Sequence, residues 1–583
     1  MPALGGLMRN NSMKRPLSAG VLSGLLMMSF QSYADDTPLL DPGAEQRQLE
    51  QVRPDTLRPA PELRFDIPDE PPMRAVADRK FDVSQFVFRG NTVFPAADLA
   101  ALIGDIRGTI TFTQLLEAAS RITKYYRDAG YIVARAYVPE QAVENGEVRI
   151  AVLEGVLGTI RVQGDSPISA ERVRAHMARL ERTGIINEAD LEYGALLLND
   201  LPGLRAEVAL RPGERTGTSD VVLNIIDEGT FDFSVDYNNF GAPVTGEHRL
   251  GMVAGINNVF NVGDRFTFRP MISDSGDTFY GALRYEMPIF TPASRVGLSF
   301  SHLLSELGEE FQDLEIENTA TTISLYGSHA FVRSRDRNIT GRLAFENRNF
   351  VRDFGASFFF PIIEEADYVL NVVDLAVVGD YRDDFHGGAV STYAASLRVG
   401  LSDVTPEEGG STVPGETRFD GKFTLLNFSA QRIQRLAPLW SASVRFDGQF
   451  SADTLDTSER MSLGGPQAVR AYRPSEALGD SALILQSELR RELPGLAERY
   501  GWLNRAEVYG LFDIGTSEVN STLAINADES WTRNGVGAGM RVTGGKSFYA
   551  DLAVATRLAD RESVVDQPDD SKVNYWLQMI YWF

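Results

Sequence analysis

The last part of the chain, from about residue 230 to Phe583, alternates apolar and polar side chains in runs of about eight to twelve residues. In the run 440–450, for example, Val444 and Phe446 alternate with Arg445 and Asp447. A period of two places the two sets on opposite faces of a β-sheet. The sequence therefore predicts a long, mostly β region with one apolar and one charged face.

Two architectures can use such a sheet. A soluble sandwich buries the apolar face against a second sheet, whereas a closed transmembrane barrel turns it toward lipid and pairs every backbone group. The length of the region, the lack of an obvious helical segment, and the Arg, Asp and Glu in mid-strand favour the barrel. At roughly 22 residues per strand and connection, residues 229–583 predict an antiparallel barrel of about 16 strands.

The end of the chain repeats this alternation and finishes on an aromatic residue. It resembles the C-terminal recognition strand of bacterial outer-membrane proteins. That resemblance implies contact with the barrel assembly machinery, and a position surrounded by outer-membrane lipid. The residues of this assembly signal are Tyr575, Leu577, Met579, Tyr581 and Phe583.

Composition excludes several classes of function. The chain has no cysteine, which excludes disulfides and thiolate metal sites, and its 5 His leave little material for a multi-histidine metal centre. Its 80 acidic and 56 basic residues give a net charge of −24, which argues against nucleic-acid binding. Gly544-Gly-Lys-Ser547 mimics the end of a P-loop, but Met540 stands where the motif needs glycine, so a hairpin turn is expected. We expect no enzyme activity, cofactor or metal.

The N-terminus has the pattern of an export signal. Lys14 and Arg15 precede an apolar run, 17–30, and Ser32-Tyr33-Ala34 supplies small residues before the expected cleavage after Ala34. Residues 1–34 are therefore a predicted signal peptide, and the protein is expected to be exported.

A short polar region and a spacer follow the signal. Within residues 35–53, Asp41-Pro42 starts a polar helix over 44–52. This helix has almost no apolar stripe, so it is not expected to join a core. It is either a disordered tail or a tethered helix that docks in a wet cavity. Six prolines then make residues 54–80 a semi-rigid linker.

Two similar modules come next, residues 81–154 and 155–228. The first predicts a strand over 81–88, a helix over 115–126, and strands over 133–138 and 148–153. The second predicts a strand over 156–162, helices over 170–180 and 191–199, and strands over 206–210 and 221–226. Each is a small α+β unit whose helices cover a three-stranded sheet and leave a sheet edge open.

This pattern, with Phe86-Val-Phe-Arg-Gly-Asn91 and Tyr125-Tyr-Arg-Asp-Ala-Gly-Tyr131, resembles POTRA domains. Such domains bind extended polypeptide, and an open strand edge supplies the means through main-chain hydrogen bonds. The alternative is a pair of structural spacers.

A charge pair is expected inside the barrel. By alternation Phe512 faces lipid, while Asp513 faces the lumen together with Glu507 and Tyr509. The stretch 464–473 lies between two strands and is either an exposed loop or one folded inward. If it folds inward, Arg470 can reach Asp513 and pin the loop through a charge-assisted hydrogen bond.

The order of these parts resembles the two-partner-secretion outer-membrane transporters (TpsB), which export haemolysins and filamentous haemagglutinins. The family's inward loop motif, Val-Arg-Gly-Tyr/Phe, matches Val469, Arg470, Ala471 and Tyr472. Its strand motif matches Phe512, Asp513 and Gly515. Ala471 departs from the family glycine, and a positive φ at that position would strain it.

The resemblance implies type V secretion in the outer membrane of a Gram-negative bacterium, with the POTRA domains in the periplasm. They would catch an unfolded secreted partner (TpsA type, haemolysin- or adhesin-like) and hand it to the barrel without ATP. The N-terminal helix would plug the resting pore. The alternative is an insertase that assembles other barrels; such relatives usually carry more POTRA modules and lack the plug helix. A plain diffusion pore does not explain the two modules.

Overall fold

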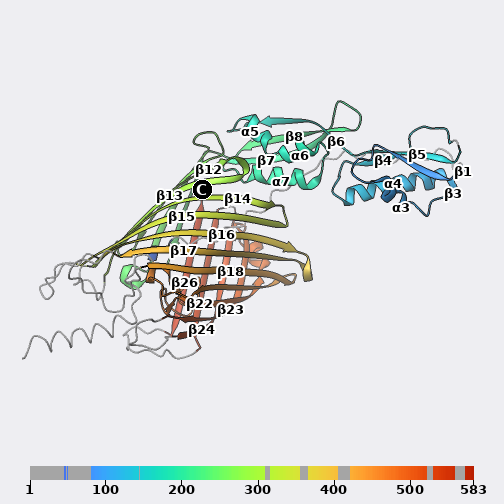
Figure 1. The fold of residues 1–583 in the computed structure, drawn as a ribbon. Helices are drawn as coiled ribbons and strands as arrows, with labels where there is room; N and C mark the ends of the chain where they lie inside the picture. The colour runs from blue at the N-terminus through green and yellow to red at the C-terminus, as the bar shows by residue number, and fades with distance from the viewer. Residues whose placement is uncertain are drawn as a thin grey trace, which may run out of the picture.

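The structure is a computed structural model (Figure 1). It describes residues 80–143, 145–308, 316–354, 366–404, 421–520, 530–545, 547–558 and 572–583, together with Glu45, Gln46 and Leu49. The predicted signal peptide lies outside the described residues. So do the remainder of the predicted N-terminal region and all of the linker except Lys80.

Sixteen antiparallel strands close into a barrel, which confirms the predicted fold class. The last strand pairs with the first, with Gln578 opposite Asn238 and Trp582 opposite Ser234. The strands are β9 (Phe231–Asn238), β10 (Arg249–Asn257), β11 (Arg265–Ser273), β12 (Thr278–Ile289), β13 (Thr291–Glu306), β14 (Ile316–Arg333), β15 (Arg337–Phe354), β16 (Ala366–Asp383), β17 (Ala389–Val404), β18 (Gly421–Ala437), β19 (Trp440–Ser451), β22 (Ser481–Glu492), β23 (Leu503–Glu518), β24 (Ser530–Gly544), β25 (Phe548–Arg557) and β26 (Val573–Trp582).

The two faces of the barrel wall follow the alternation in the sequence. On β19, Val444 and Phe450 are 45% and 46% exposed, whereas Ser443 and Asp447 are buried. The apolar face therefore points outward and the polar face lines the lumen, as a barrel in lipid requires. Gly544 and Ser547 lie in the hairpin between β24 and β25, so this stretch is a turn.

The first module contains β1 (Lys80–Val83), β2 (Gln85–Arg89), α3 (Ala96–Leu102), β3 (Gly108–Thr111), α4 (Phe112–Asp128), β4 (Arg135–Tyr137) and β5 (Glu147–Leu153). Its three-stranded sheet has the order β2-β5-β4, and β1 pairs separately with β3. The single strand predicted over 81–88 is thus two strands, because the chain turns at Ser84, where the amides of Ser84 and Gln85 bond Gly146 O. The sequence interpretation missed α3 and β3.

The second module repeats this plan with β6 (Val156–Gly164), α5 (Ala170–Ala175), α6 (Ala178–Thr183), α7 (Glu188–Asn199), β7 (Leu204–Pro212) and β8 (Thr218–Asp227), in sheet order β6-β8-β7. The helix predicted over 170–180 is two helices, because the chain leaves the first helix at His176 and starts the second after Met177.

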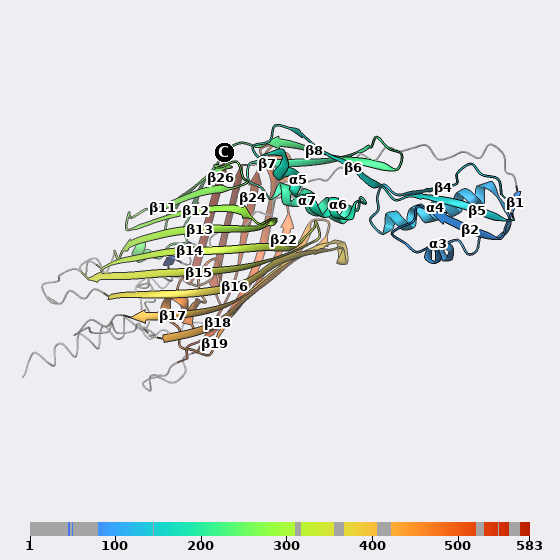
Figure 2. The same ribbon diagram turned by 45° about the horizontal axis from the view of Figure 1, so that its top comes forward.

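Both modules project from one end of the barrel (Figures 1 and 2). The second module contacts the turn between β14 and β15, where Arg335 pairs with Glu188 and Glu192 of α7. Beside it, Arg333 pairs with Asp200. These contacts fix α7 against the barrel rim. Among the described residues, no helix is long and apolar enough to cross a membrane.

Candidate functional site

The connection from β19 to β22 enters the barrel. It contains the 3₁₀ turn η5 (Thr457–Glu459) and the short strands β20 (Met461–Ser462) and β21 (Leu478–Gly479), which pair with each other. Val469, Ala471 and Tyr472 are no more than 2% exposed. This segment, residues 452–480, is called the inward loop below. The exposed-loop alternative is therefore wrong.

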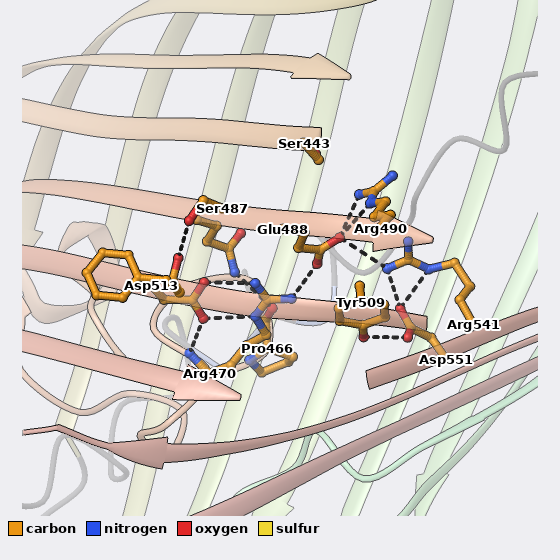
Figure 3. A network of polar contacts seen from close by, with 12 residues as sticks. Ser443, Pro466, Arg470, Ser487, Glu488, Arg490, Tyr509, Asp513, Arg541 and Asp551 are labelled. Atoms are coloured by element: carbon orange, nitrogen blue, oxygen red, sulfur yellow. Dashed lines mark hydrogen bonds and ion pairs between the residues drawn. The ribbon is translucent and has the colours of Figure 1, made fainter. Parts of the chain in front are cut away.

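The structure brings Arg470 and Asp513 together (Figure 3). The guanidinium of Arg470 donates from Nε and Nη2 to the two carboxylate oxygens of Asp513, both at 2.8 Å, and the backbone N–H of Arg470 donates at 3.1 Å. Asp513 is fully buried on β23, whereas Phe512 beside it is 39% exposed on the outer face. Two parallel charge-assisted bonds in a buried site fix the loop in both position and orientation.

Further charged residues extend this pair along the wall (Figure 3). The sequence interpretation placed Glu507 on this face but missed the others. Arg470 Nη1 also binds Glu488, whose other oxygen accepts from Arg490 at 2.7 Å. Arg541 then joins Glu507 and Asp551, each at 2.8 Å. On β22, Glu488 and Arg490 alternate with outward-facing residues such as Leu489, so the same period-two argument could have found them.

The tip of the loop lies on β24–β26. Trp576 Nε1 donates to Arg470 O and Asn574 Nδ2 donates to Ala471 O, both at 2.7 Å. Ala471 does not have a positive φ, so the strain considered for alanine at this position does not arise. Its methyl group instead fills space above Gly535, where an added Cβ would lie 2.3 Å from the Ala471 Cβ.

The other motif residues also support the loop. Tyr472 is close to both Arg533 and Arg557, whose guanidinium carbons are 5.4 and 5.1 Å from its ring centroid, a cation–π arrangement. Gly515 leaves room for the loop, because a Cβ there would lie 3.2 Å from a methyl of Val469.

A second set of contacts, also missed from the sequence, holds the base of the loop to the opposite wall. Glu459, fully buried, pairs with Arg348 of β15 at 3.2 Å and Arg398 of β17 at 2.9 Å. Asp480 accepts hydrogen bonds from Leu455 N and Arg460 Nε. The inward loop therefore spans the lumen between two charged anchors.

The three described N-terminal residues are helical and lie against the lumen wall. Glu45 accepts from Arg249 Nη2 at 2.9 Å, and the Gln46 side chain bonds Ser301 and Thr322. Leu49 is only 2% exposed within an apolar cluster of the wall. The expectation that this region joins no core is wrong for Leu49, because the lumen itself supplies apolar partners.

The C-terminal strand β26 closes the barrel beside β9. Tyr575, Met579, Tyr581 and Phe583 are exposed on the outer face, at 36–78%. Leu577 lies on the same face by alternation, and Phe583 N bonds Phe233 O. This row is available to lipid and to other proteins.

The outer edges of the module sheets differ in how far they are covered. On β4, Thr123 Oγ1 accepts from Ala136 N, and on β7 the Asn199 side chain bonds both N and O of Ala206. On β6, Leu157 N bonds Gly184 O and Val156 pairs with Ile185, whereas no further strand pairs with the outer edge of β2 or the rest of β6 in the described chain. Beyond these single contacts the outer edges of β4 and β7 likewise have no strand partner in the described chain, so each module has two open edges, β2 and β4 in the first and β6 and β7 in the second.

One buried carboxylate in the first module ties the end of β5 to the loop that follows β2. Glu154, at the end of β5, accepts from Thr92 N, Val93 N and the phenol of Tyr126. Burial and the neighbouring carboxylate raise the pKa of Tyr126 above its usual range, so the phenol stays protonated and keeps donating.

Comparisons with known proteins agree with this architecture. A sequence model described as "POTRA domain, ShlB-type" matches residues 81–155. Heme/hemopexin transporter protein HuxB of Haemophilus influenzae (strain 86-028NP) is 26% identical, covering 93% of this chain and 95% of the relative. Hemolysin transporter protein ShlB of Serratia marcescens is 21% identical, covering 79% and 80%. Both relatives are transporter proteins.

The solved structure of CdiB from Escherichia coli has a TM-score of 0.67 at 20% identity, and the match covers 98% of this chain and 100% of that chain. It supports the fold alone. A second sequence model, "Haemolysin secretion/activation protein ShlB/FhaC/HecB", matches residues 217–542, more than half of the chain. The chain therefore belongs to the haemolysin secretion/activation protein family ShlB/FhaC/HecB, the outer-membrane transporters of two-partner secretion, whose POTRA domains lie in the periplasm.

Proposed function

We propose that this chain binds one exported partner protein in unfolded form through its two modules and passes it through the barrel lumen without ATP. The observation that carries the proposal is the set of open sheet edges in the two modules, β2 and β4 in the first and β6 and β7 in the second, at the periplasmic end of a closed barrel. Main-chain hydrogen bonds at such an edge accept an extended polypeptide whatever its side chains are.

Movement without ATP needs another source of free energy. Gly544 and Ser547 of the P-loop-like stretch lie where β24 turns into β25. Folding of the partner outside the cell makes its return through the lumen unfavourable, and this supplies the direction of transport. The N-terminal residues, seated on the lumen wall at Arg249, close the resting pore and leave when the partner arrives.

Two further partners follow from the outer face of the barrel. The barrel assembly machinery binds the C-terminal strand β26 through its aromatic residues, including Tyr581, and through Phe583 directly after it. Lipid of the outer membrane covers the remaining apolar face.

The proposed function is tested by comparing culture media, by mass spectrometry, from cells with and without this gene. We expect one large protein to disappear from the medium while the set of outer-membrane proteins stays unchanged. Loss of many barrel proteins from the outer membrane, with the medium unchanged, would show that the chain is an insertase instead.

The contact between the tip of the inward loop and β24 gives a separate prediction. In Gly535→Ala the new methyl collides with Ala471, so the tip must leave β24 and export should fall about tenfold, the equivalent of 1.4 kcal/mol. The added Cβ would also lie 3.1 Å from Thr556 O, so the single variant strains the wall slightly.

The matched control is the double variant Gly535→Ala with Ala471→Gly, which removes the colliding methyl. It should recover most of the export, measured as partner in the medium at equal transporter levels. If the double variant is as impaired as Gly535→Ala, the fit between the two residues does not hold the loop.

A further inference from the structure

Part of the lumen wall is apolar although it faces the inside of the barrel. Leu303 lies between Ser301 and Ser305 on the inner face of β13, and all three are buried. It belongs to a cluster contributed by seven strands, β11 to β16 and β18, which also includes Leu49 and Leu455. The wall members are Met271, Tyr280, Leu303, Ala320, Phe350, Tyr368, Leu370, Val372, Phe423 and Leu425. Apolar side chains in a watery channel are stable only while something covers them.

Polar groups beside this cluster contact the N-terminal residues. Arg269 Nη1 donates to the main-chain oxygen of Leu49 at 2.8 Å, and Arg249 Nη2 donates to the Glu45 carboxylate at 2.9 Å. The surface thus binds a backbone carbonyl, a carboxylate and an aliphatic side chain. We call Arg249, Arg269 and the wall around Leu303 the luminal seat.

The luminal seat has donors that Glu45 and Leu49 do not use. Arg249 is 1% exposed, yet among the described residues its Nε and Nη1 have no hydrogen-bond partner, and neither does Nε of Arg269. A buried donor without an acceptor costs free energy. A guanidinium has five N–H donors, so the seat can accept more oxygen atoms than the N-terminal residues give it.

We propose that the luminal seat is a binding site for the polypeptide in transit, and that Glu45 and Leu49 occupy it only at rest. This inference rests on the proposed function. Glu45 and Leu49 are one helical turn apart, a rise of about 6 Å. Two residues of extended chain span about 6.6 Å. The seat therefore selects extended segments in which Asp or Glu precedes an aliphatic residue by two positions.

The test places a photo-crosslinking amino acid at Leu303 in the full chain, in cells that export the partner identified from the medium. The partner carries a C-terminal disulfide-locked domain, so it stalls in the barrel. We expect an adduct between residue 303 and the partner, mapping to Asp/Glu-x-aliphatic segments. The control probe at Phe300, on the outer face of the same strand and 40% exposed, should give none.

If the partner without the locked domain is exported normally and the stalled partner gives no adduct at residue 303, the luminal seat is overturned and the proposed function stands. No export from the unaltered chain overturns the proposed function instead. Should the probe at Leu303 prevent barrel assembly, the probe moves to Met271, with the same expectation. Arg249→Met should lower the adduct yield several-fold. An unchanged yield would show that the luminal seat does not require Asp or Glu in the segment that it binds.

Discussion

Arg470→Ala should reduce export at least tenfold while leaving the barrel assembled. The substitution removes the cation from Asp513, which is fully buried, and from Glu488. Breaking a buried ion pair by deleting one partner costs about 3–5 kcal/mol, because the remaining charge is uncompensated. The loop then no longer holds its place in the lumen. Export is measured as partner in the medium, and assembly as heat-modifiable migration of the barrel.

The matched control is Arg445→Ala. Arg445 also lines the lumen and pairs with a carboxylate, Asp447 at 2.7 Å, but its side chain is 36% exposed and does not touch the loop. It should export normally. If export falls equally in both variants, loss of a luminal positive charge is the cause and the loop anchor is not.

A double-mutant cycle separates the pair from its surroundings. Arg470→Ala and Asp513→Ala remove the same contact. The double variant should therefore export at least as much partner as whichever single variant exports less. Additive losses would mean that the two residues act independently.

Alternation explains why the Arg470–Asp513 contact could be predicted from the sequence. Once the region is a barrel, parity alone sends Asp513 inward and Phe512 outward, and a buried carboxylate needs a cation. The same argument would have placed Glu488 and Arg490 in the lumen. The local sequence therefore predicts whether each strand residue faces the lumen or the lipid.

Contacts between distant segments could not be predicted in this way. Glu459 meets Arg348 and Arg398 only because the loop crosses to the far wall, and no pattern near residue 459 shows that path. The space for Ala471 likewise depends on Gly535, which lies on another strand.

Average polarity also misled the interpretation of the N-terminal region. A helix with a single leucine has no stripe to bury in a soluble core. The lumen, however, offers an apolar cluster and a buried Arg249 at one place, so Leu49 and Glu45 are sufficient. The contacts of Glu45 and Leu49 therefore depend on the composition of the lumen wall and could not be predicted from residues 44–52 alone.

Glu45→Ala should therefore open the resting pore. Glu45 is the carboxylate that pairs with Arg249, which is 1% exposed and would stay buried as an unpaired cation if the N-terminal residues remained seated. A cost of about 3–5 kcal/mol corresponds to a shift of more than a hundredfold toward the released state. Single-channel conductance of the purified full chain in planar bilayers should show long-lived open events that the unaltered protein rarely shows.

Removing the cation as well provides the control. In Glu45→Ala with Arg249→Met no charge is left uncompensated, so the N-terminal residues can return to the lumen wall, Leu49 to the apolar cluster and Gln46 to its hydroxyl partners. Open events should become several-fold rarer than in Glu45→Ala alone. A double variant that conducts as much as the single one would show that the buried ion pair does not hold the N-terminal residues. Closure would then depend on other contacts in the lumen.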